Sequence, residues 1–436
     1  MITMMEYAKR RKKVLQSIGK TSIMLIPSAP MALRNGDAFY PYRQNSDFYY
    51  LTGFNEPEAV AVLAPNRKEG EFILFNRPRH RDEEVWDGKR AGQKGACQHF
   101  LADQSFPMQE LTEKLPALLA GREAIYFPVG KNKCFDTQIF SAVKQIRAKI
   151  RGGVKSPTTF VDVGIVLHEM RLIKSAGEKA LLQKAVDITV TAHLAAMRTC
   201  RPGILESDLH AELMYEFLQQ GAASVAYSSI VGSGKNTCTL HYTDNNQPIR
   251  QGSLVLIDAG AEYHNYAADI TRTFPANGKF SAEQRAVYEI VLAAQLAGIK
   301  AIRPGAAFDA YHRAIVNVLT AGLVELGLLK GRVHDLIEKK AYLPFFMHKS
   351  GHWLGLDVHD AGSYNLRGKS RSLQAGMVLT VEPGIYITAD IPRIPARWHN
   401  IGVRIEDDII VTAKGCEVLS AKLPKTVGEI EAVMQG

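Results

Sequence analysis

The fold is decided by Leu254-Val255-Leu256-Ile257-Asp258-Ala259-Gly260 and, after a polar turn region, by Ala268-Asp269-Ile270-Thr271-Arg272-Thr273-Phe274. Each stretch is a short apolar run of the kind that forms a buried strand, and each carries an aspartate. Pairing of the two strands would place Asp258 beside Asp269. Two carboxylates that close repel, so one must take up a proton unless a cation lies between them. From these residues alone, an equally good interpretation is that Asp258 is a turn residue and Asp269 pairs with Arg272.

Two further acidic residues end or interrupt apolar strands downstream, namely Glu382 and Glu406. A buried acid without a partner is costly, so four such cases ask for a common explanation. Around Glu406, the alternation of a strand puts Arg404 and Asp408 on the same face and Asp407 on the other. Spacing alone therefore does not decide which of the three acids faces a site.

Three histidines fall within twelve residues of one another, at His348, His352 and His359, among several glycines. A single histidine there would usually be a satisfied core residue, but three in one glycine-containing segment indicate a site. One imidazole with four carboxylates makes an oxygen-rich set of ligands. Such a set favours Mn²⁺, with Co²⁺, Zn²⁺ or Fe²⁺ as substitutes.

The composition is that of a soluble globular protein. The chain has 436 residues, of which 46% are apolar and 22% charged, so we expect two domains rather than one core. No apolar run approaches the roughly 20 residues that span a bilayer, so no membrane segment is expected. The net charge of +9 is spread along the chain without any nucleic-acid-binding signature, so no nucleic-acid partner is expected. The five scattered cysteines argue against a disulfide framework and favour the cytoplasm.

The hydrophobic pattern changes near Leu172. Residues 1–172 alternate short strands with helices, which predicts an α/β domain. At Ser175 and Glu178 a capping box opens a long helix that continues to about Cys200. Residues 173–436 combine further long helices with strand pairs, so the fold class is α+β. The additional helices are expected over 205–220, 282–302 and 308–326.

At this point the chain resembles the aminopeptidase P (Xaa-Pro aminopeptidase) family, within the superfamily of creatinase, prolidase and methionine aminopeptidase. The resemblance covers both halves and is strong because its motifs follow the family's order. In the first half it rests on the stretch from Tyr40 to Phe54. In the second half it rests on Leu240-His241-Tyr242, Asp258-Ala259-Gly260, Asp269-Ile270-Thr271-Arg272-Thr273, His352-Trp353-Leu354-Gly355, Glu382-Pro383-Gly384 and Arg404-Ile405-Glu406-Asp407.

The resemblance implies a pita-bread catalytic domain, two pseudo-symmetric halves of sheet and helix, behind a smaller N-terminal domain that serves oligomerisation and caps the cleft. It also selects Glu406 among the three acids. Asp258 would bind one metal with both oxygens, and Asp269 and Glu406 would bridge two divalent cations, most suitably Mn²⁺. His352 and Glu382 would complete the second metal.

The activity that the resemblance implies is hydrolysis of the N-terminal Xaa-Pro bond of peptides that carry proline in the second position. A hydroxide between the two cations would attack the bond and release the first residue. Glu382 would act as general base. His359 and His241 would contact the substrate and stabilise the oxyanion, and His348 would line the cleft. Arg404 and Tyr386 would orient the carboxylates.

Trp86 and Lys349 need separate comment. Trp86 resembles a residue in a family segment that reaches the active site of a neighbouring subunit, which implies a homo-oligomer, a tetramer; an exposed loop tryptophan is the alternative. Lys349 departs from the family, where a small residue is common. The alternative functions are a prolidase, which cuts only dipeptides, and a non-catalytic binding module. Creatinase fits less well because it lacks the metals, whereas this chain retains all five ligands.

Overall fold

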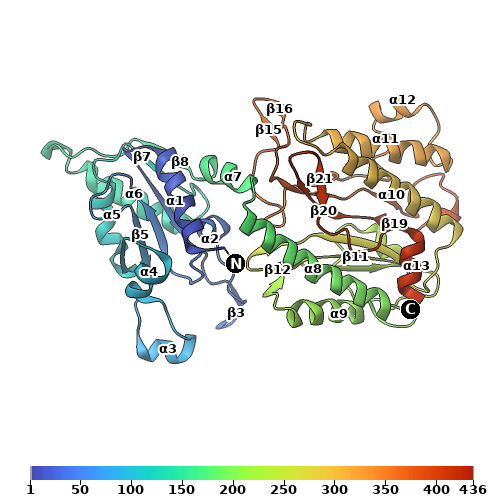
Figure 1. The fold of residues 1–436 in the computed structure, drawn as a ribbon, viewed down its shortest axis with the longest axis horizontal. Coiled ribbons are helices and arrows are strands. Elements are labelled where there is room, and N and C mark those ends of the chain that lie inside the picture. Colours follow the sequence, from blue (N-terminus) through green and yellow to red (C-terminus); the bar gives the residue numbers. More distant parts are fainter. Residues whose placement is uncertain (1, 436) are drawn as a thin grey trace. The chain divides into compact units, whose positions relative to one another are not determined.

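A computed structural model describes residues 2–435, and the chain divides into two units, of which the first ends at Arg171 and the second begins at Leu172 (Figure 1). Both units contain helices and strands, which confirms the α+β class. Among the described residues, no helix is long and apolar enough to cross a membrane. All five cysteines are free thiols.

A six-stranded mixed sheet forms the centre of the first unit. Its strand order is β6–β5–β4–β1–β7–β8, with β1, β4 and β5 antiparallel and β6, β7 and β8 added in parallel. Alternate residues of β1, such as Ile23 and Leu25, pack into a core with helices α5 (Leu111–Leu119) and α6 (Lys133–Arg147). The strands are β1 (Ser22–Pro27), β4 (Val60–Leu63), β5 (Phe72–Asn76), β6 (Gln104–Pro107), β7 (Ala124–Phe127) and β8 (Thr159–Asp162), with a small hairpin of β2 (Leu33–Asn35) and β3 (Ala38–Phe39).

The helices of the first unit begin at capping residues in several cases. Thr3 accepts a hydrogen bond from the Glu6 amide at the start of α1, and Asn132 caps α6 in the same way. Helix α3 differs because none of its residues is buried, and its Trp86 is 87% exposed. The helices are α1 (Met4–Ile18), α2 (Ser46–Thr52), α3 (Arg81–Asp87), α4 (Gly92–Phe100), α5 (Leu111–Leu119), α6 (Lys133–Arg147) and α7 (Gly164–Leu172).

The second unit opens with the predicted capping box. The Ser175 hydroxyl accepts the Glu178 amide proton, and the Glu178 carboxylate accepts that of Ser175. Helix α8 ends before Cys200, as expected. Figure 1 shows α8 and α9 on one side of the central strands and α10 and α11 on the other, so two helix pairs enclose the strands that carry the acidic residues. The helices are α8 (Ala176–Thr199), α9 (Glu206–Gln219), α10 (Ala282–Ala301), α11 (Ala310–Glu325), α12 (Val333–Glu338) and α13 (Val427–Gln435).

Asp258 lies inside β11, as the sequence predicts, between Ile230 on β10 and Thr271 on β14. Asp269 directly precedes β14, which begins at Ile270 and pairs with the end of β11. A side chain at Gly260 would lie 1.7 Å from the Ala268 carbonyl oxygen, so only glycine allows this close crossing. These strands are β9 (Ser224–Val225), β10 (Ile230–Ser233), β11 (Leu254–Ala259), β12 (Ala261–Tyr263), β13 (Tyr266–Ala267) and β14 (Ile270–Pro275).

Glu382 and Glu406 both lie where one pair of strands ends and the next begins. Strand β17 pairs with β20, and β18 pairs with β19, so Glu382 and Glu406 both fall in the gap between the pairs. Pro383, which has no amide proton, lies in the same gap and cannot continue the ladder. The strands are β15 (Asn365–Leu366), β16 (Lys369–Ser370), β17 (Val378–Val381), β18 (Gly384–Ile387), β19 (Ile401–Arg404), β20 (Asp407–Val411) and β21 (Cys416–Val418).

The interpretation that Asp269 pairs with Arg272 is wrong. Arg272 instead forms an ion pair with Asp407, at 2.7 Å between Nη2 and Oδ1. The predicted alternation holds: Asp407 points away from Arg404 and toward Arg272, while Asp408 accepts the amide proton of Asp269.

Candidate metal centre

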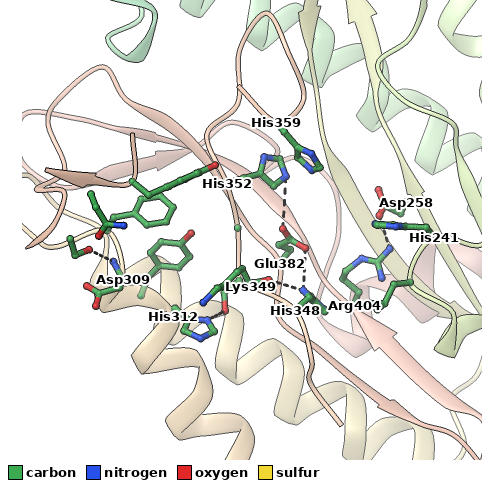
Figure 2. A pocket seen from close by; sticks show the side chains of 18 residues that line it. His241, Asp258, Asp309, His312, His348, Lys349, His352, His359, Glu382 and Arg404 are labelled. Carbon is green, nitrogen blue, oxygen red and sulfur yellow. Dashed lines mark hydrogen bonds and ion pairs between the residues drawn. The ribbon is translucent and has the colours of Figure 1, made fainter. Parts of the chain in front are cut away.

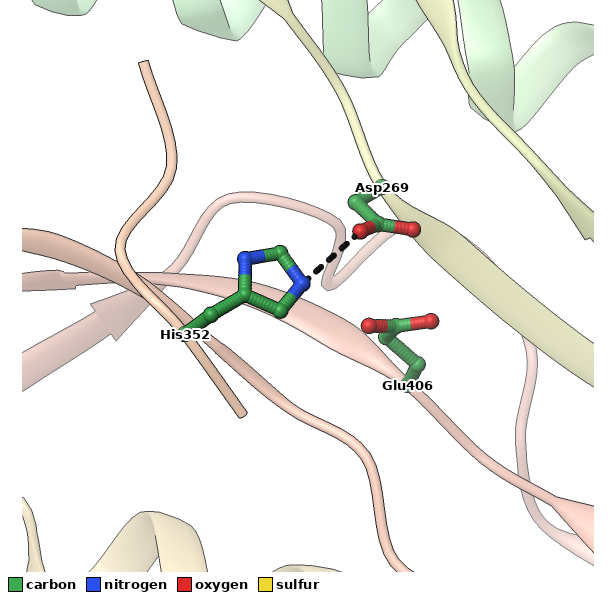
Figure 3. Close-up of side chains that lie close together, drawn as sticks. All are labelled: Asp269, His352 and Glu406. Atoms are coloured by element: carbon green, nitrogen blue, oxygen red, sulfur yellow. Dashed lines mark ion pairs between the residues drawn. The ribbon is translucent and has the colours of Figure 1, made fainter. Parts of the chain in front are cut away.

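Asp269, His352 and Glu406 form the tightest cluster of potential ligands (Figure 3). One ligand atom from each lies within 4.8 Å of the others. The His352 Nε2 atom lies 3.2 Å from Asp269 Oδ2. The Thr271 hydroxyl donates to Glu406 at 2.8 Å, and the amide of Glu406 donates to the Thr271 carbonyl. Strand β14 therefore holds one carboxylate at its start and orients another from its second residue.

The remaining two predicted ligands extend this cluster in two directions. The Oε1 atom of Glu382 lies 3.8 Å from His352 Nε2. Asp258 is joined to Asp269 through Tyr227, whose hydroxyl contacts the carboxylates of both, at 2.6 Å for Asp269. The structure thus brings all five side chains into one continuous group.

The histidine loop is held by its backbone so that the imidazole of His352 faces the carboxylates. Its Nδ1 lies 2.9 Å from the Trp353 carbonyl oxygen, which leaves Nε2 free to face Asp269. Gly351 has a φ of +154°, and a side chain there would lie 2.1 Å from the Thr380 carbonyl oxygen. Glycine is therefore required where the loop crosses β17.

Arg404 organises the other side of the group. Its guanidinium donates to Asp258 Oδ2, to the Tyr386 hydroxyl at 3.0 Å and to the Thr271 hydroxyl at 3.2 Å. His348 Nε2 lies 2.9 Å from the same Tyr386 hydroxyl. A chain of hydrogen bonds therefore connects an imidazole to Asp258 through Tyr386 and Arg404.

A cavity of about 800 Å³ opens above these residues. Figure 2 shows Glu382 at its centre, with His352 and His359 on one side and His348, Arg404, Asp258 and His241 on another. The rings of His352 and His359 are 4.3 Å apart and nearly perpendicular. The rest of the wall comes from Leu240, Phe308, Asp309, Tyr311, His312, Lys349, Ser350, Gly351, Tyr364, Asn365 and Ser370. The cavity is large enough for a short peptide.

Three side chains of the group, those of Glu406, Glu382 and His352, have raised pKa values. Burial, together with the charges of Asp269, Glu382 and Asp258, raises the pKa of Glu406 well above its ordinary value. Burial likewise raises the pKa of Glu382 to about 8. Burial would lower the pKa of His352, but its hydrogen bond to Asp269 raises it to about 9. The single positive charge of the adjacent Arg404 does not balance the charges of four carboxylates.

Two residues that touch the site, Tyr227 and His312, were not predicted from the sequence. Tyr227 links two carboxylates, and His312 lies 2.7 Å from the hydroxyl of Ser350 at the cavity wall. Asp408 is fully buried and fixes the Asp269 amide at 3.1 Å. Tyr227 lies in a short polar segment without any periodic pattern, so no sequence signal marked it. The sequence did place Asp408 on the strand face of Glu406, and its position beside the Asp269 amide agrees with that alternation.

The other predicted residues lie as follows. His241 is an exposed side chain on the segment between β10 and β11 and lines the cavity, as do His348 and His359. Trp86 belongs to α3 of the first unit, and its predicted contact with substrate stays a prediction.

Comparison with known proteins adds to this geometry. Residues 180–413 match the family described as metallopeptidase family M24, and residues 7–126 match the aminopeptidase P N-terminal domain. The chain is 46% identical over 434 residues to the Xaa-Pro aminopeptidase of Escherichia coli (strain K12), with 99% of this chain and 98% of the relative covered.

Solved structures are similar over the whole chain. An aminopeptidase from Pseudomonas aeruginosa superimposes with a TM-score of 0.98 at 50% identity, covering 100% of this chain and 98% of the other. Zinc-substituted E. coli aminopeptidase P in complex with product has a TM-score of 0.96 at 46% identity, with the same coverage. These matches confirm the fold that the sequence predicts, including its pita-bread second domain.

Proposed function

The chain belongs to metallopeptidase family M24 and carries an aminopeptidase P N-terminal domain, and from this premise we propose that it hydrolyses the N-terminal Xaa-Pro bond of peptides and releases the first residue. The observation that carries the proposal is the convergence of four carboxylates and one imidazole beside a peptide-sized cavity, which four further histidines line. The E. coli relative bears the name Xaa-Pro aminopeptidase and covers nearly the whole chain.

The five side chains fit a pair of divalent cations. Their oxygen-rich chemistry suits Mn²⁺, and the charge of such ions would offset the neighbouring carboxylates that, after burial, raise the pKa of Glu406. We therefore assign Asp258, Asp269, His352, Glu382 and Glu406 as the residues that would hold two ions. Cations bound there would lower the pKa of water and so supply a hydroxide nucleophile at neutral pH.

The residues around this group would move the proton. Glu382 lies between two imidazoles, 3.8 Å from His352 Nε2 and 3.6 Å from His348 Nδ1. It would accept a proton as general base and return it to the leaving proline nitrogen. That nitrogen, like any amide nitrogen, must take up a proton to leave as a neutral amine. A carboxylate in the centre of the cavity can reach both partners.

The neighbouring histidines and the hydrogen-bond chain would orient the substrate. His359 and His241 would donate to the oxyanion of the tetrahedral intermediate, and His348 would line the cleft. Arg404 and Tyr386 would keep Asp258 in place, as their hydrogen bonds indicate. The side chains supply orientation, and Glu382 supplies the proton transfer.

Assembly and location are part of the same proposal. The exposed Trp86 and Val85 of α3 would contact a neighbouring subunit of a homo-oligomer, a tetramer, and Trp86 would reach that neighbour's substrate. The first unit would serve this assembly and cap the cleft. The five free thiols suit the cytoplasm.

The test is cleavage of an Xaa-Pro-Xaa tripeptide and an Xaa-Pro dipeptide after chelation and return of Mn²⁺. The proposal expects release of the first residue from the tripeptide, abolished by chelator and by Glu382→Ala. Cleavage of the dipeptide alone would show a prolidase. A binding module would purify without metal and show no thermal shift with Mn²⁺. A protein that binds Mn²⁺ but cleaves neither peptide would retain the metal site and contradict the proposed reaction.

A further inference from the structure

Glu206, the first residue of α9, is a buried carboxylate outside the catalytic group. It is 0% exposed, and among residues 2–435 no basic side chain lies within ion-pair distance of it. Five hydrogen bonds satisfy its oxygens. Oε1 accepts from Ser233 N (2.7 Å), Ser233 Oγ (2.8 Å) and Asn236 Nδ2 (3.1 Å), and Oε2 accepts from Tyr242 Oη (2.8 Å) and Gln247 N (3.0 Å).

All five donors belong to one segment, residues 233–247, which joins β10 to β11 and carries His241. Ser233 begins the segment, Tyr242 directly follows His241, and Gln247 lies near its end. The backbone amide of Glu206 also donates to the Gln247 carbonyl oxygen at 2.9 Å. One side chain therefore holds the start, the middle and the end of the segment together.

His241 depends on this segment for its position. It makes no hydrogen bond or ion pair with any residue in the described part of the chain, although it lines the cavity. Its neighbour Tyr242 is tied to Glu206 through the phenolic hydroxyl. The direction of the imidazole is thus set by the backbone that Glu206 anchors.

Helix capping does not account for Glu206. The amide of Leu205 at the start of α9 is already satisfied by Asp208, at 2.9 Å. A buried carboxylate without a counter-ion is costly even with full hydrogen bonding. Its five bonds instead all go to the segment that carries His241.

We propose that Glu206 is a positioning residue that acts through His241, holding its segment so that the imidazole faces the substrate. The inference rests on the proposed function, in which His241 contacts the substrate. It assigns to Glu206 no contact with substrate or metal.

Glu206→Gln tests the proposal with almost no change in shape. An amide can keep an acceptor oxygen toward Ser233, but its NH₂ group then faces the Gln247 amide proton, and two donors meet. Tyr242→Phe is the milder variant, because it removes one hydrogen bond and leaves the carboxylate with four.

A double-mutant cycle distinguishes positioning from general destabilisation. We expect Glu206→Gln to lower kcat/KM on the tripeptide about tenfold in the wild-type background, and by less than about twofold in a His241→Ala background. Tyr242→Phe should show the same non-additivity with a smaller first effect. An equal loss in both backgrounds, or an active enzyme indifferent to His241→Ala, would overturn the proposal.

Tyr266→Phe is the matched control, because it removes a buried tyrosine–glutamate hydrogen bond, Tyr266 to Glu178 at 3.0 Å, elsewhere in the same unit. The effect of Tyr266→Phe on kcat/KM, whatever its size, should be equal in the wild-type and His241→Ala backgrounds.

Hydrogen exchange gives a readout that needs no activity. Glu206→Gln should speed amide exchange in residues 233–247 while leaving residues 350–360 unchanged, in the full-length protein with Mn²⁺. Unchanged exchange in 233–247 would refute the anchoring role. If the wild type cleaves no Xaa-Pro peptide but the exchange changes as expected, then the proposed function fails and the anchoring of the segment stands.

Discussion

Arg272 and Asp407 form an ion pair from which water is excluded. Both side chains are 0% exposed, and Nη2 lies 2.7 Å from Oδ1. The same guanidinium donates through Nη1 to the carbonyl oxygen of Glu406, also at 2.7 Å. Lys425, Ser420 and Gln295 complete the surroundings of the Asp407 carboxylate. The pair therefore fixes the backbone of Glu406, which is a predicted metal ligand.

Loss of this pair should destabilise the second unit strongly. Asp407→Asn leaves the Arg272 guanidinium buried without its full counter-charge, and we expect the free energy of unfolding to fall by about 3–5 kcal/mol. The measurement is urea unfolding of the chelated protein followed by tryptophan fluorescence, since Trp353 and Trp398 are buried in this unit.

The matched control is Glu289→Gln, which removes the exposed pair between Arg285 and Glu289 on α10. We expect that change to cost less than about 1 kcal/mol. Similar small losses in both variants would show that the buried pair does not hold the fold at this point.

Tyr227 should matter for metal affinity more than for folding. Its hydroxyl contacts Asp258 and Asp269 together, so Tyr227→Phe removes one orienting contact from each carboxylate. We expect Mn²⁺ to bind about 10- to 100-fold more weakly, as found for residues that orient metal ligands. Calorimetric titration of the chelated variant with Mn²⁺ measures this, and unchanged affinity would show that the hydroxyl is replaceable.

Local patterns in the sequence were sufficient for the elements and for the approximate place of the site. The capping box at Ser175 set the start of α8, and the apolar runs before Asp258 and Glu382 marked their strands. These signals lie within a few residues of the feature that they predict, because helix caps and strand alternation are local physics. The order of the motifs then indicated the family.

Partners far apart in the chain could not be predicted in this way. The sequence offered Asp269 as a neighbour for Arg272, but the true partner, Asp407, lies 135 residues away and is brought close by the packing of β14 against β20. Tyr227 and Glu206 lack any periodic signal for the same reason. Their roles depend on which strands and loops meet, and that is decided by the whole fold.

Asp47 should give the first unit a distinct acid sensitivity. Burial alone would raise its pKa, but His168 and Arg171, the latter at 2.8 Å, lower it from 3.8 to about 2. A depressed pKa contributes stability that is full above the unfolded value and is lost as the pH falls from about 4 to about 2. Asp47→Asn should therefore remove roughly 2–3 kcal/mol at pH 7 and reduce the loss of stability between pH 4 and pH 2.

Acid titration of both proteins by circular dichroism at fixed urea measures this difference. The variant should approach the wild type in stability as the pH reaches 2. A constant gap between the two proteins from pH 7 to pH 2 would mean that the effect of Asp47 comes from packing and not from its charge.

Lys349 should influence which peptides bind. It lines the cavity on the histidine loop, its side chain is exposed, and no described residue forms an ion pair with it. An unpaired ammonium there favours substrates that carry a carboxylate, so Lys349→Gly should raise the KM of a free-acid tripeptide about two- to fivefold at low salt, which is the scale of an exposed ion pair. The kcat should not change, because the interaction is equal in the ground state and the transition state.

The C-terminal amide of the same tripeptide should show no such rise in KM. A salt concentration of 0.5 M should abolish the difference between the acid and the amide, since exposed charges at roughly this ionic strength are screened over a few ångströms. Lys300→Ala on α10, outside the cavity, is the matched control. An equal rise in KM for the acid and the amide would mean that Lys349 acts by shape and not by charge.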